Sequence, residues 1–199
     1  MKIIIASSNI GKLNEFKELL KDHELFLASE FIKDFNPIEN GNSFKQNAKI
    51  KATYLWNNLN NELKKDYTVL SDDSGLCVEA LNNAPGIYSA RYGNNYEGDF
   101  ENKDARNRAK LKHELQNLGL NSSKAAFVCV LCLIKNNEFY FSKGVCDGKI
   151  ICDEYGDNGF GFDCMFIPDN YDKTFAQFSE SEKNQISHRA LALKNMSIL

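Results

Sequence analysis

The N-terminal segment changes its hydrophobic period within a few residues, and this change limits the possible folds more than any other feature. Residues 2–6 (KIIIA) form a short β-branched run that predicts a strand. After a polar turn, Leu13, Phe16, Leu19 and Leu20 recur at helical spacing in KLNEFKELLKDH. A strand that leads directly into an amphipathic helix predicts an α/β domain.

The rest of the chain predicts helices early and late, with strands between them. Ser43 followed three residues later by Gln46 is typical of a capping box and starts the second predicted helix. No repeat or linker interrupts the pattern, so we expect one domain over residues 1–199 with a long central mixed sheet flanked by helices. The expected elements are strands at 24–29 and 67–71, helices at 43–59 and 102–119 (closed by Gly119), a hairpin or meander within 124–155, a glycine-rich loop at 156–163, a short strand at 164–167 and a helical tail at 180–196.

Charge and composition exclude several classes of protein. The 24 Lys and Arg residues are outnumbered by 27 Asp and Glu residues, which gives a formal net charge of −3. No global basic field is present to attract nucleic acid, so an anionic ligand must be held by local cations, a metal ion or backbone N–H groups. The apolar run at the N-terminus is too short for a signal peptide or a membrane span, so we expect a soluble cytoplasmic protein without a membrane partner.

Six cysteines are scattered along the chain, and only CVLC at 129–132 has the C-x-x-C spacing. This motif lies inside the strand-like run AAFVCVLCLI, where Cys129 and Cys132 would point to opposite faces. A shared metal or redox site is therefore not expected, and the thiols are interpreted as small core residues in a reducing compartment.

The turn SSNIGK at 7–12 is a candidate for binding phosphate groups. It joins the first strand to the first helix, whose N-terminal N–H groups favour anions. The motif is neither a P-loop nor a dinucleotide-binding glycine turn. An ordinary capped turn is the alternative interpretation.

Acidic residues stand where the sheet is expected to end. Asp72 and Asp73 follow the strand predicted at 67–71, Glu39 precedes the second helix, and Asp163 ends the glycine-rich loop. Carboxylates at strand ends suit Mg²⁺, which is often held by one or two carboxylates and substrate phosphates. The alternative for the aspartate pair is a turn or a helix cap.

Cations and aromatic residues complete the set of candidates. Lys51 lies on the second predicted helix, and Lys183, His188 and Arg189 lie together in EKNQISHRALAL. The two phenylalanines of NGFGFD at 158–163 offer rings for stacking on a base. The alternatives are solvated helix faces for the lysines, a surface helix end for SHR, and core packing for both phenylalanines.

The order of these motifs resembles the inosine triphosphate pyrophosphatase family. The resemblance extends from ASSNIGKLNE through ENGNSFKQNAKIKA, SDDSGLCVEALNNAPGIYSARYG and GFGFDCMFIP to EKNQISHRALAL, and so covers nearly the whole chain. It implies a long mixed sheet in two lobes around a substrate cleft, and a homodimer. It also implies an enzyme that uses Mg²⁺ to cleave ITP, dITP and XTP into the monophosphate and pyrophosphate.

The resemblance also implies residue roles. Phosphates would be bound through the turn and the lysine that follows it, Mg²⁺ through acidic side chains, and the nucleoside through the glycine-rich loop and the tail. The implied phosphate-binding residues are Ser7, Ser8, Asn9, Ile10, Gly11, Lys12 and Lys51; the metal-binding residues are Glu39 and Asp73 with Asp72 close by; Asp73 activates water; Ser74 touches substrate; Phe160, Gly161, Phe162 and Asp163 line the nucleoside pocket; and Lys183, His188 and Arg189 close over the base.

The glycine-rich loop departs from the pattern of the family it resembles. A Gly-Gly-Phe-Gly-Tyr-Asp-Pro type of run is expected, and the sequence has NGFGFDC, with Phe162 in place of the tyrosine and Cys164 in place of the proline. A hydroxyl contact is lost at Phe162. Two other functions stay open: a related pyrophosphatase for other modified nucleotides, including pyrimidines, and a nucleotide-binding regulator without catalysis.

Overall fold

The computed structural model describes residues 1–198 and forms two compact units. Among the described residues, the first unit contains 1–73, 129–144 and 189–198, and the second contains 74–128 and 145–188. Each unit has its own hydrophobic core. The predicted α/β class is confirmed, and the substrate cleft remains a prediction.

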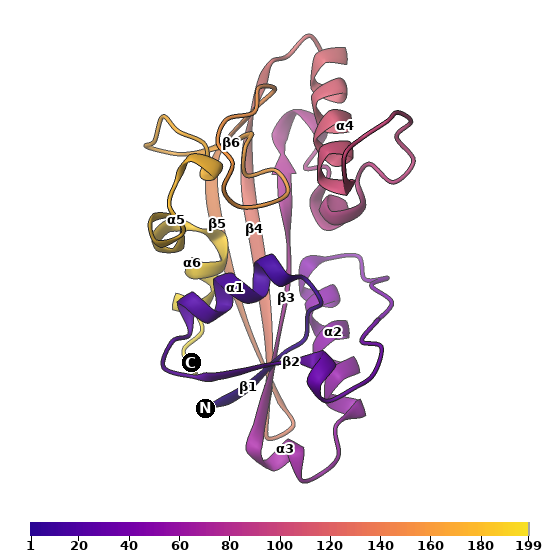
Figure 1. Ribbon diagram of the computed structural model, residues 1–199, viewed down its shortest axis with the longest axis vertical. Coiled ribbons are helices and arrows are strands. Elements are labelled where there is room, and N and C mark those ends of the chain that lie inside the picture. The colour runs from indigo at the N-terminus through magenta and orange to yellow at the C-terminus, as the bar shows by residue number, and fades with distance from the viewer. Residues whose placement is uncertain (199) are drawn as a thin grey trace. The chain divides into compact units, whose positions relative to one another are not determined.

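The strands form one mixed sheet in the order β2-β1-β3-β4-β5-β6 (Figure 1). β1 pairs in parallel with β2 and β3, whereas β5 and β6 are antiparallel. The short turn between β4 and β5 contains Asn136 and Asn137, whose φ values of 52° and 65° suit a tight hairpin. The strands are β1 Lys2–Ile5, β2 Glu24–Leu27, β3 Tyr67–Val78, β4 Ser122–Lys135, β5 Glu138–Ile151 and β6 Phe166–Pro168.

β3 is longer than the sequence predicts. The strand was expected to end at residue 71, with Asp72 and Asp73 beyond it, but it continues through SDDSGL to Val78. Both aspartates are buried, at 1% and 6% exposure, and both have cationic partners. Because side chains neutralise these carboxylates, the charge does not force the chain to turn.

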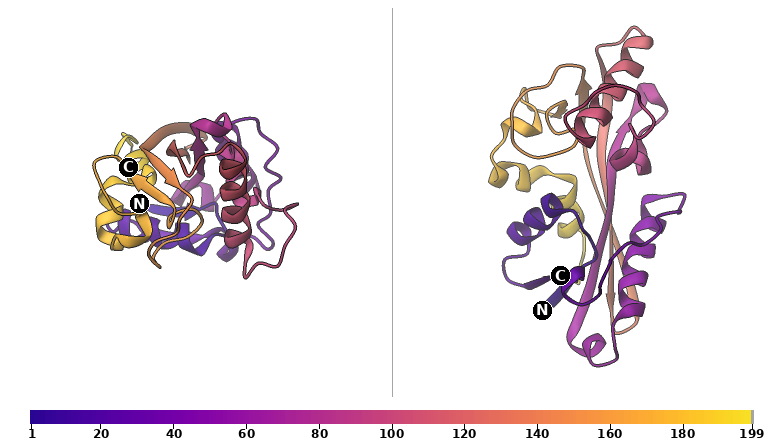
Figure 2. Two further views of the ribbon diagram at one scale, coloured as in Figure 1. Left: turned by 90° about the horizontal axis from the view of Figure 1, so that it is seen from above. Right: turned by 45° about the vertical axis from the view of Figure 1, so that its right-hand side comes forward.

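Helices α1 and α2 cover opposite faces of the sheet in the first unit (Figures 1 and 2). α1 packs Leu13 and Phe16 into one core cluster, and α2 packs Ala48, Ala52 and Leu55 into the other. The end of α6 lies in the same cluster as α1. The helices are α1 Ile10–Leu19, α2 Phe44–Asn58, α3 Leu63–Asp66, α4 Lys103–Asn117, α5 Glu180–Ile186 and α6 His188–Lys194, with 3₁₀ turns at Ala28–Glu30, Glu79–Leu81, Gly86–Arg91 and Phe175–Gln177.

Ser43 caps α2 as predicted, but the full capping box does not form. The Ser43 hydroxyl accepts the Gln46 N–H at 3.3 Å. The Gln46 side chain accepts the N–H of Asn42, rather than that of Ser43, at 2.6 Å. α2 therefore begins as the sequence predicts, with its second cap bond shifted by one residue.

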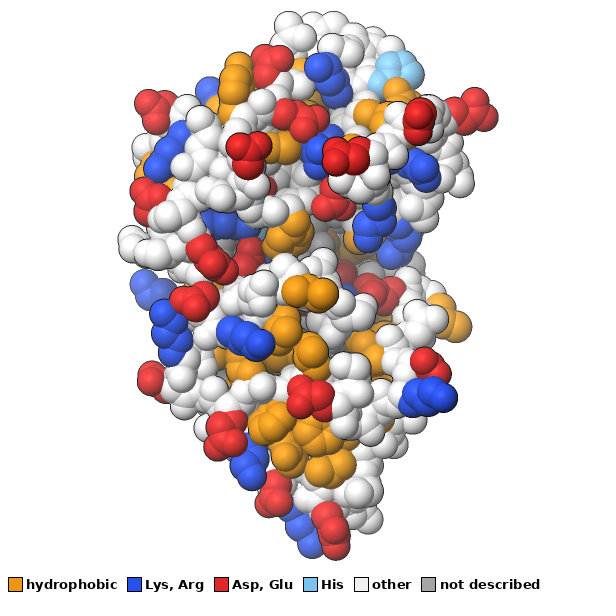
Figure 3. All heavy atoms as spheres, in the orientation of Figure 1, with side chains coloured by type: hydrophobic (Ala, Val, Ile, Leu, Met, Phe, Trp, Pro, Cys, Tyr) orange, Lys and Arg blue, Asp and Glu red, His pale blue; other side chains and the backbone are white. Residues whose placement is uncertain are grey.

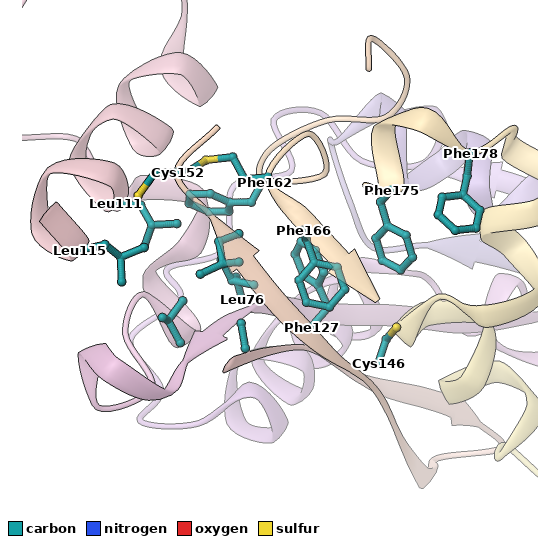
Figure 4. Packing of buried hydrophobic residues seen from close by; sticks show 14 residues of the cluster. Leu76, Leu111, Leu115, Phe127, Cys146, Cys152, Phe162, Phe166, Phe175 and Phe178 are labelled. Atoms are coloured by element: carbon teal, nitrogen blue, oxygen red, sulfur yellow. The ribbon is translucent and has the colours of Figure 1, made fainter. Parts of the chain in front are cut away.

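Aromatic side chains dominate the core of the second unit. Phe127, Phe166 and Phe175 lie together, with ring centroids 4.7–6.0 Å apart. Phe162 and Phe178 extend the same cluster, which Leu111 and Leu115 of α4 also join (Figure 4). α4 is closed by Gly119, as predicted.

The predicted helical tail is two helices. Ser187 is extended, at φ −65° and ψ 150°, and separates α5 from α6. The N–H of Ser187 still bonds the carbonyl of Lys183 at 2.8 Å, which ends α5. Serine favours such helix ends because its hydroxyl competes with the helical backbone.

Four of the six cysteines are buried as predicted, and Cys77 and Cys164 are partly exposed. All six lie within the described residues and none forms a disulfide. Cys129 and Cys132 belong to different core clusters, so the two thiols of CVLC face opposite sides of β4. Over residues 1–198, no helix is long and apolar enough to cross a membrane.

Candidate active site

Alternation along β3 separates the two neighbouring aspartates. Leu70 packs in the cluster of α1, and Val69 packs in the cluster of α2. Asp72 follows Leu70 by two residues, and its partners are Lys12 of α1 and Arg189 of α6. Asp73 is on the opposite face, where its partners Asn47 and Lys51 come from α2.

The Asp73 face holds a buried cation between two carboxylates. Lys51 Nζ lies 2.9 Å from Asp73 Oδ1 and 3.0 Å from Glu39 Oε2. Asn47 Nδ2 donates to the other Asp73 oxygen, Oδ2, at 3.2 Å. Both oxygens of Asp73 therefore have fixed donors, which sets the orientation of the carboxylate.

Burial and charge act against each other at this pair. Burial lowers the pKa of Lys51, but the attraction of Asp73, Asp72 and Glu39 outweighs it, so the pKa lies above its ordinary value. Burial raises the pKa of Asp73, and Lys51 and Lys12 only partly oppose that rise. Lys51 is thus a buried, charged lysine, and the solvated-face alternative is wrong for it.

The Asp72 face is a second charge network. Lys12 Nζ lies 2.8 Å from Asp72 Oδ2, and Arg189 Nη2 lies 3.4 Å from the same oxygen. The other arm of the Arg189 guanidinium pairs with Glu15 of α1. Burial lowers the pKa of Arg189 to about 10, which still leaves it charged at neutral pH.

Two further predicted site residues have partners on the α1 side of β3. Arg189, predicted to close over the base, is 1% exposed and pairs with Glu15 and Asp72. Asp72, predicted to lie close to Glu39 and Asp73, directs its carboxylate towards α1 and α6. Both roles stay predictions.

The predicted phosphate turn has the expected local structure. Asn9 caps α1 by accepting the Lys12 N–H at 3.1 Å, and the Asn9 N–H donates to the Ser7 hydroxyl at 3.1 Å. Ser8 and Ile10 are exposed, whereas Gly11 and the Lys12 side chain are partly covered. The first N–H groups of α1 therefore lie at a solvent-accessible turn beside a lysine.

In the second unit, the glycine-rich loop is organised by Asp163. Its Oδ2 accepts the Phe160 N–H at 2.9 Å and the Lys183 ammonium at 2.8 Å. Lys183 Nζ also lies 5.2 Å from the Phe160 ring centroid. Lys183 is only 6% exposed, so the solvated-face alternative is wrong for this lysine too.

A cavity of about 560 Å³ opens beside this loop. The start of α4 forms one wall, and residues 156–161 form another. The lining residues are Asn102, Lys103, Asp104, Arg108, Glu154, Gly156, Asp157, Asn158, Gly159, Phe160, Gly161, Asp163 and Cys164. The volume is in the range of small-molecule sites.

Two predicted pocket residues lie in the core instead. Phe162 is 3% exposed and lies in the core cluster of the second unit, near Leu111 in Figure 4. His188 is 5% exposed, and its ring stacks on Phe127 with centroids 4.9 Å apart. The surface alternative for SHR is therefore wrong, and Phe162 can line a pocket only through its backbone. Ser74 is half-buried in β3, directly after Asp73.

Four residues of these clusters were not among the predicted ones: Glu15, Asn47, Asp104 and Arg108. Asn47 and Lys51 are four residues apart on α2 and both reach Asp73. Asp104 and Arg108 have the same spacing on α4 and both reach Gly161. Polar residues four positions apart lie on the same face of a helix, and this spacing could have identified both pairs from the sequence. Glu15 has no polar residue four positions away, so the sequence gives no such signal for it.

Glu39 and Asp73 are the carboxylates that the sequence resemblance assigns to a metal ion. Within residues 1–198, no three His, Cys, Asp or Glu side chains form a group that could hold a metal ion. Glu39 and Asp73 nevertheless direct one oxygen each at a single cationic nitrogen. On the face shown in Figure 3, acidic and basic side chains are interspersed. This face therefore has no large patch of one charge that could attract an ion.

The comparisons with known proteins agree with the sequence-based resemblance. The model of the Ham1 family matches residues 3–198. The dITP/XTP pyrophosphatase of Campylobacter jejuni subsp. jejuni is 46% identical over 199 residues, or 100% of this chain and 96% of that protein. The dITP/XTP pyrophosphatase of Treponema denticola is 41% identical over 99% of this chain and 97% of that protein.

Solved structures give the same result. The Staphylococcus aureus Ham1 protein aligns with a TM-score of 0.78 and 42% identity, covering 98% of this chain and 95% of that one. A HAM1 protein from Coxiella burnetii aligns with a TM-score of 0.80 and 34% identity over the same shares. Both the sequence and the fold are therefore shared along nearly the whole chain.

Proposed function

The chain belongs to the Ham1 family, and we propose that it hydrolyses ITP, dITP and XTP to the nucleoside monophosphate and pyrophosphate. It is a nucleoside triphosphate pyrophosphatase, as the resemblance to the inosine triphosphate pyrophosphatase family predicts. The observation that carries the proposal is the buried Lys51 ammonium between Glu39 and Asp73, in a chain that matches the family from residue 3 to residue 198.

Nucleotide pyrophosphatases generally use a divalent metal ion, and we assign Mg²⁺ to Glu39 and Asp73. These residues fit the ion, because they offer two hard oxygens that already converge on one cation. Mg²⁺ is usually held by one or two carboxylates and by substrate phosphates, so a larger protein cage is not required. Bound Mg²⁺ would screen the triphosphate and stabilise the charge that develops on the leaving pyrophosphate.

Asp73 is the group proposed to activate water. Lys51 and Asn47 fix its two oxygens, and its raised pKa makes it a better proton acceptor than an ordinary aspartate. The water would attack the α-phosphorus, its proton would pass to Asp73, and the bond between the α-phosphorus and the bridging oxygen to the β-phosphate would break. Ser74 follows on the same strand and is assigned a substrate contact.

The phosphates are assigned to the turn at 7–12. The N–H groups at the start of α1 and the hydroxyls of Ser7 and Ser8 are donors, and Lys12 adds a charge. Asp72 pairs with Lys12 and orients it. Asp72 also pairs with Arg189, which in turn pairs with Glu15. A chain with net charge −3 must neutralise a triphosphate locally, and Lys12, Lys51 and bound Mg²⁺ together would supply the positive charge.

The purine is assigned to the second unit, where Phe160 and Lys183 lie together. A 6-keto purine presents an acceptor where adenine presents an amino donor. The Lys183 ammonium, which carries three N–H donors, would satisfy the first and oppose the second. Such mismatches discriminate by several kcal/mol.

A nucleotide panel tests the proposal. ITP, dITP, XTP, GTP, ATP and methylated pyrimidine triphosphates would be supplied with Mg²⁺ and again after chelation, with pyrophosphate and phosphate measured separately. We expect pyrophosphate from the first three substrates and none after chelation. Faster hydrolysis of the pyrimidines would favour the rival pyrophosphatase, and ITP binding without turnover would favour the regulator.

We also propose that the protein is cytoplasmic and, as the sequence resemblance implies, a homodimer. Light scattering coupled to size-exclusion chromatography measures the mass directly. A mass equal to the 22.6 kDa chain at micromolar concentration would contradict the dimer.

A further inference from the structure

Two side chains of α4 hold the glycine-rich loop by the peptide groups on either side of Gly161. Asp104 Oδ2 accepts the Gly161 N–H at 2.9 Å. Arg108 Nη1 donates to the Gly161 carbonyl at 3.2 Å. The two residues are one helical turn apart, so a single face of α4 supplies both bonds.

The loop turns sharply at Gly161. Its φ is +64°, a left-handed conformation that residues with side chains rarely adopt, although a Cβ there would meet no atom within 4 Å. Asp163 fixes the preceding peptide by accepting the Phe160 N–H. With the two bonds from α4, three polar backbone groups of Phe160 and Gly161 have side-chain partners.

Arg108 is itself fixed by an acidic residue beyond the loop. Its Nε lies 2.8 Å from Glu154 Oε2, while Nη1 reaches Gly161. A guanidinium makes both contacts because its donors form a rigid fork, whereas a lysine has one nitrogen for both. Asp104, Arg108, Glu154 and Gly161 all line the same cavity.

We propose that Asp104 and Arg108 are positioning residues that hold the Phe160–Gly161 segment in the conformation that binds the purine. The expected effect on substrate affinity rests on the proposed function. The expected effect on the loop conformation rests on the hydrogen bonds alone. Without the two bonds, the loop populates other conformations. The apparent affinity for substrate then falls in proportion to the fraction that is still competent.

The kinetic test compares Asp104→Ala and Arg108→Gln with the wild type, using ITP and Mg²⁺. We expect KM to rise roughly tenfold in each variant with kcat changed less than about twofold, because a tenfold change corresponds to ~1.4 kcal/mol, the scale of one hydrogen bond to a charged group. In the double variant, the loss of binding free energy calculated from KM should be smaller than the sum of the losses in the two single variants, because both bonds hold the same segment. Asp104→Asn keeps an acceptor oxygen and should recover most of the affinity.

Hydrogen exchange gives a readout that does not depend on activity. In Asp104→Ala the Gly161 amide should exchange faster, while amides in the middle of α4 keep their protection. Lys112→Gln is the matched control, because it removes one charge from α4 a turn beyond Arg108 and, among residues 1–198, Lys112 has no hydrogen bond or ion pair with the loop. Its KM and its exchange pattern should equal those of the wild type.

Each outcome is decisive. Unchanged KM and unchanged exchange at Gly161 would overturn the inference. A fall in kcat together with a lower thermal midpoint would also overturn it, because the two residues would then only stabilise the fold. A folded wild type that hydrolyses no ITP would instead refute the proposed function. In that case faster Gly161 exchange in Asp104→Ala would still support the structural part of the inference.

Discussion

Lys51 stands between the two carboxylates of the proposed metal and water site, so its replacement tests both groups at once. In Lys51→Met the side chain keeps its length and loses its charge, which leaves Asp73 and Glu39 without their shared cation. We expect ITP turnover to fall roughly a hundredfold or more, since charge aimed at a reacting group is worth that much. The free energy of unfolding at neutral pH should fall by about 3 kcal/mol, because a buried charge is left uncompensated.

The pH dependence of that loss has a definite sign. Burial raises the pKa of Asp73, and without Lys51 the pKa rises further. As the pH falls, protonation removes the uncompensated charge, so urea denaturation at about pH 5 should show a smaller deficit than at about pH 7. Lys49→Met is the control, because Lys49 is exposed on the same helix, over the Phe139 ring. Wild-type turnover in Lys51→Met would refute the role of Lys51.

At the scale of single residues, the sequence predicts which groups are present better than where they point. The types and order of Lys12, Lys51 and Asp73 are enough to indicate a phosphate and metal site. The partners of Asp72 and Arg189 could not be predicted, because a side chain's direction depends on how far its strand or helix continues. An error of a few residues at the end of β3 hides the alternation that separates the two aspartates.

Within β3, the alternation predicts that neighbouring substitutions act through different properties. Asp73→Asn removes the proposed base and should abolish turnover while largely sparing the fold, because Asn keeps one acceptor for Lys51. Asp72→Asn instead weakens the hold on Lys12 and Arg189, and should raise KM for ITP and lower stability before it affects kcat. Steady-state kinetics and urea denaturation of both variants check this, and the same kinetic pattern in both would contradict it.

The N-terminus of α5 carries a pH-dependent cap. Hydrogen bonds from the Ser179 backbone and hydroxyl, with one from Lys173, lower the pKa of Glu182 to about 2, against an ordinary 4.5. The charged cap therefore stabilises the fold above about pH 4.5, and this contribution is lost as the pH falls towards 2. Glu182→Gln keeps an acceptor but no charge, so its stability difference from the wild type should vanish in acid. Glu180→Gln, on the same turn, is the control and should show no such convergence.

Element boundaries show where local patterns stop being informative. Ser43 marks the start of α2 correctly, because a cap is a local hydrogen bond, whereas α1 begins at Ile10, two residues before the predicted helical segment. The division between α5 and α6 at Ser187 was not predicted, since the hydrophobic spacing continues across it. Ser187 is fully buried, and its extended conformation reflects tertiary packing that a helical period does not encode.

For the whole molecule, the order of motifs was more informative than any one of them. SSNIGK alone is an ordinary capped turn, yet its place before ENGNSF, SDDSGL, GFGFD and ISHR indicated the family that the full-length match confirms. The division into two units was implied by the same resemblance and not by composition. Each unit then contributes its own cluster, with Lys51 in one and Lys183 in the other.

The thiols are distributed over both units, so their ionisation acts on the stability of the whole chain. Burial raises the pKa of Cys132, Cys146 and Cys164 to about 12 and that of Cys129 well above its ordinary value. In the unfolded chain a thiol ionises near about pH 8.5, so with rising pH the unfolded state loses protons first. The free energy of unfolding should therefore fall above about pH 8.5, by up to ~1.4 kcal/mol per pH unit for each fully buried thiol and by less for the half-buried Cys164.

Urea denaturation under reducing conditions, at about pH 7.5, 8.5 and 9.5, measures this fall. Cys132→Ala removes one buried thiol and should make the alkaline decline shallower by the contribution of that group, whatever its effect at neutral pH. Because the comparison is of slopes, the cavity that Ala leaves does not enter it. Identical slopes in the variant and the wild type would show that Cys132 ionises as readily in the folded chain as in the unfolded one. That result would contradict the prediction, because burial between α2 and the sheet disfavours the thiolate.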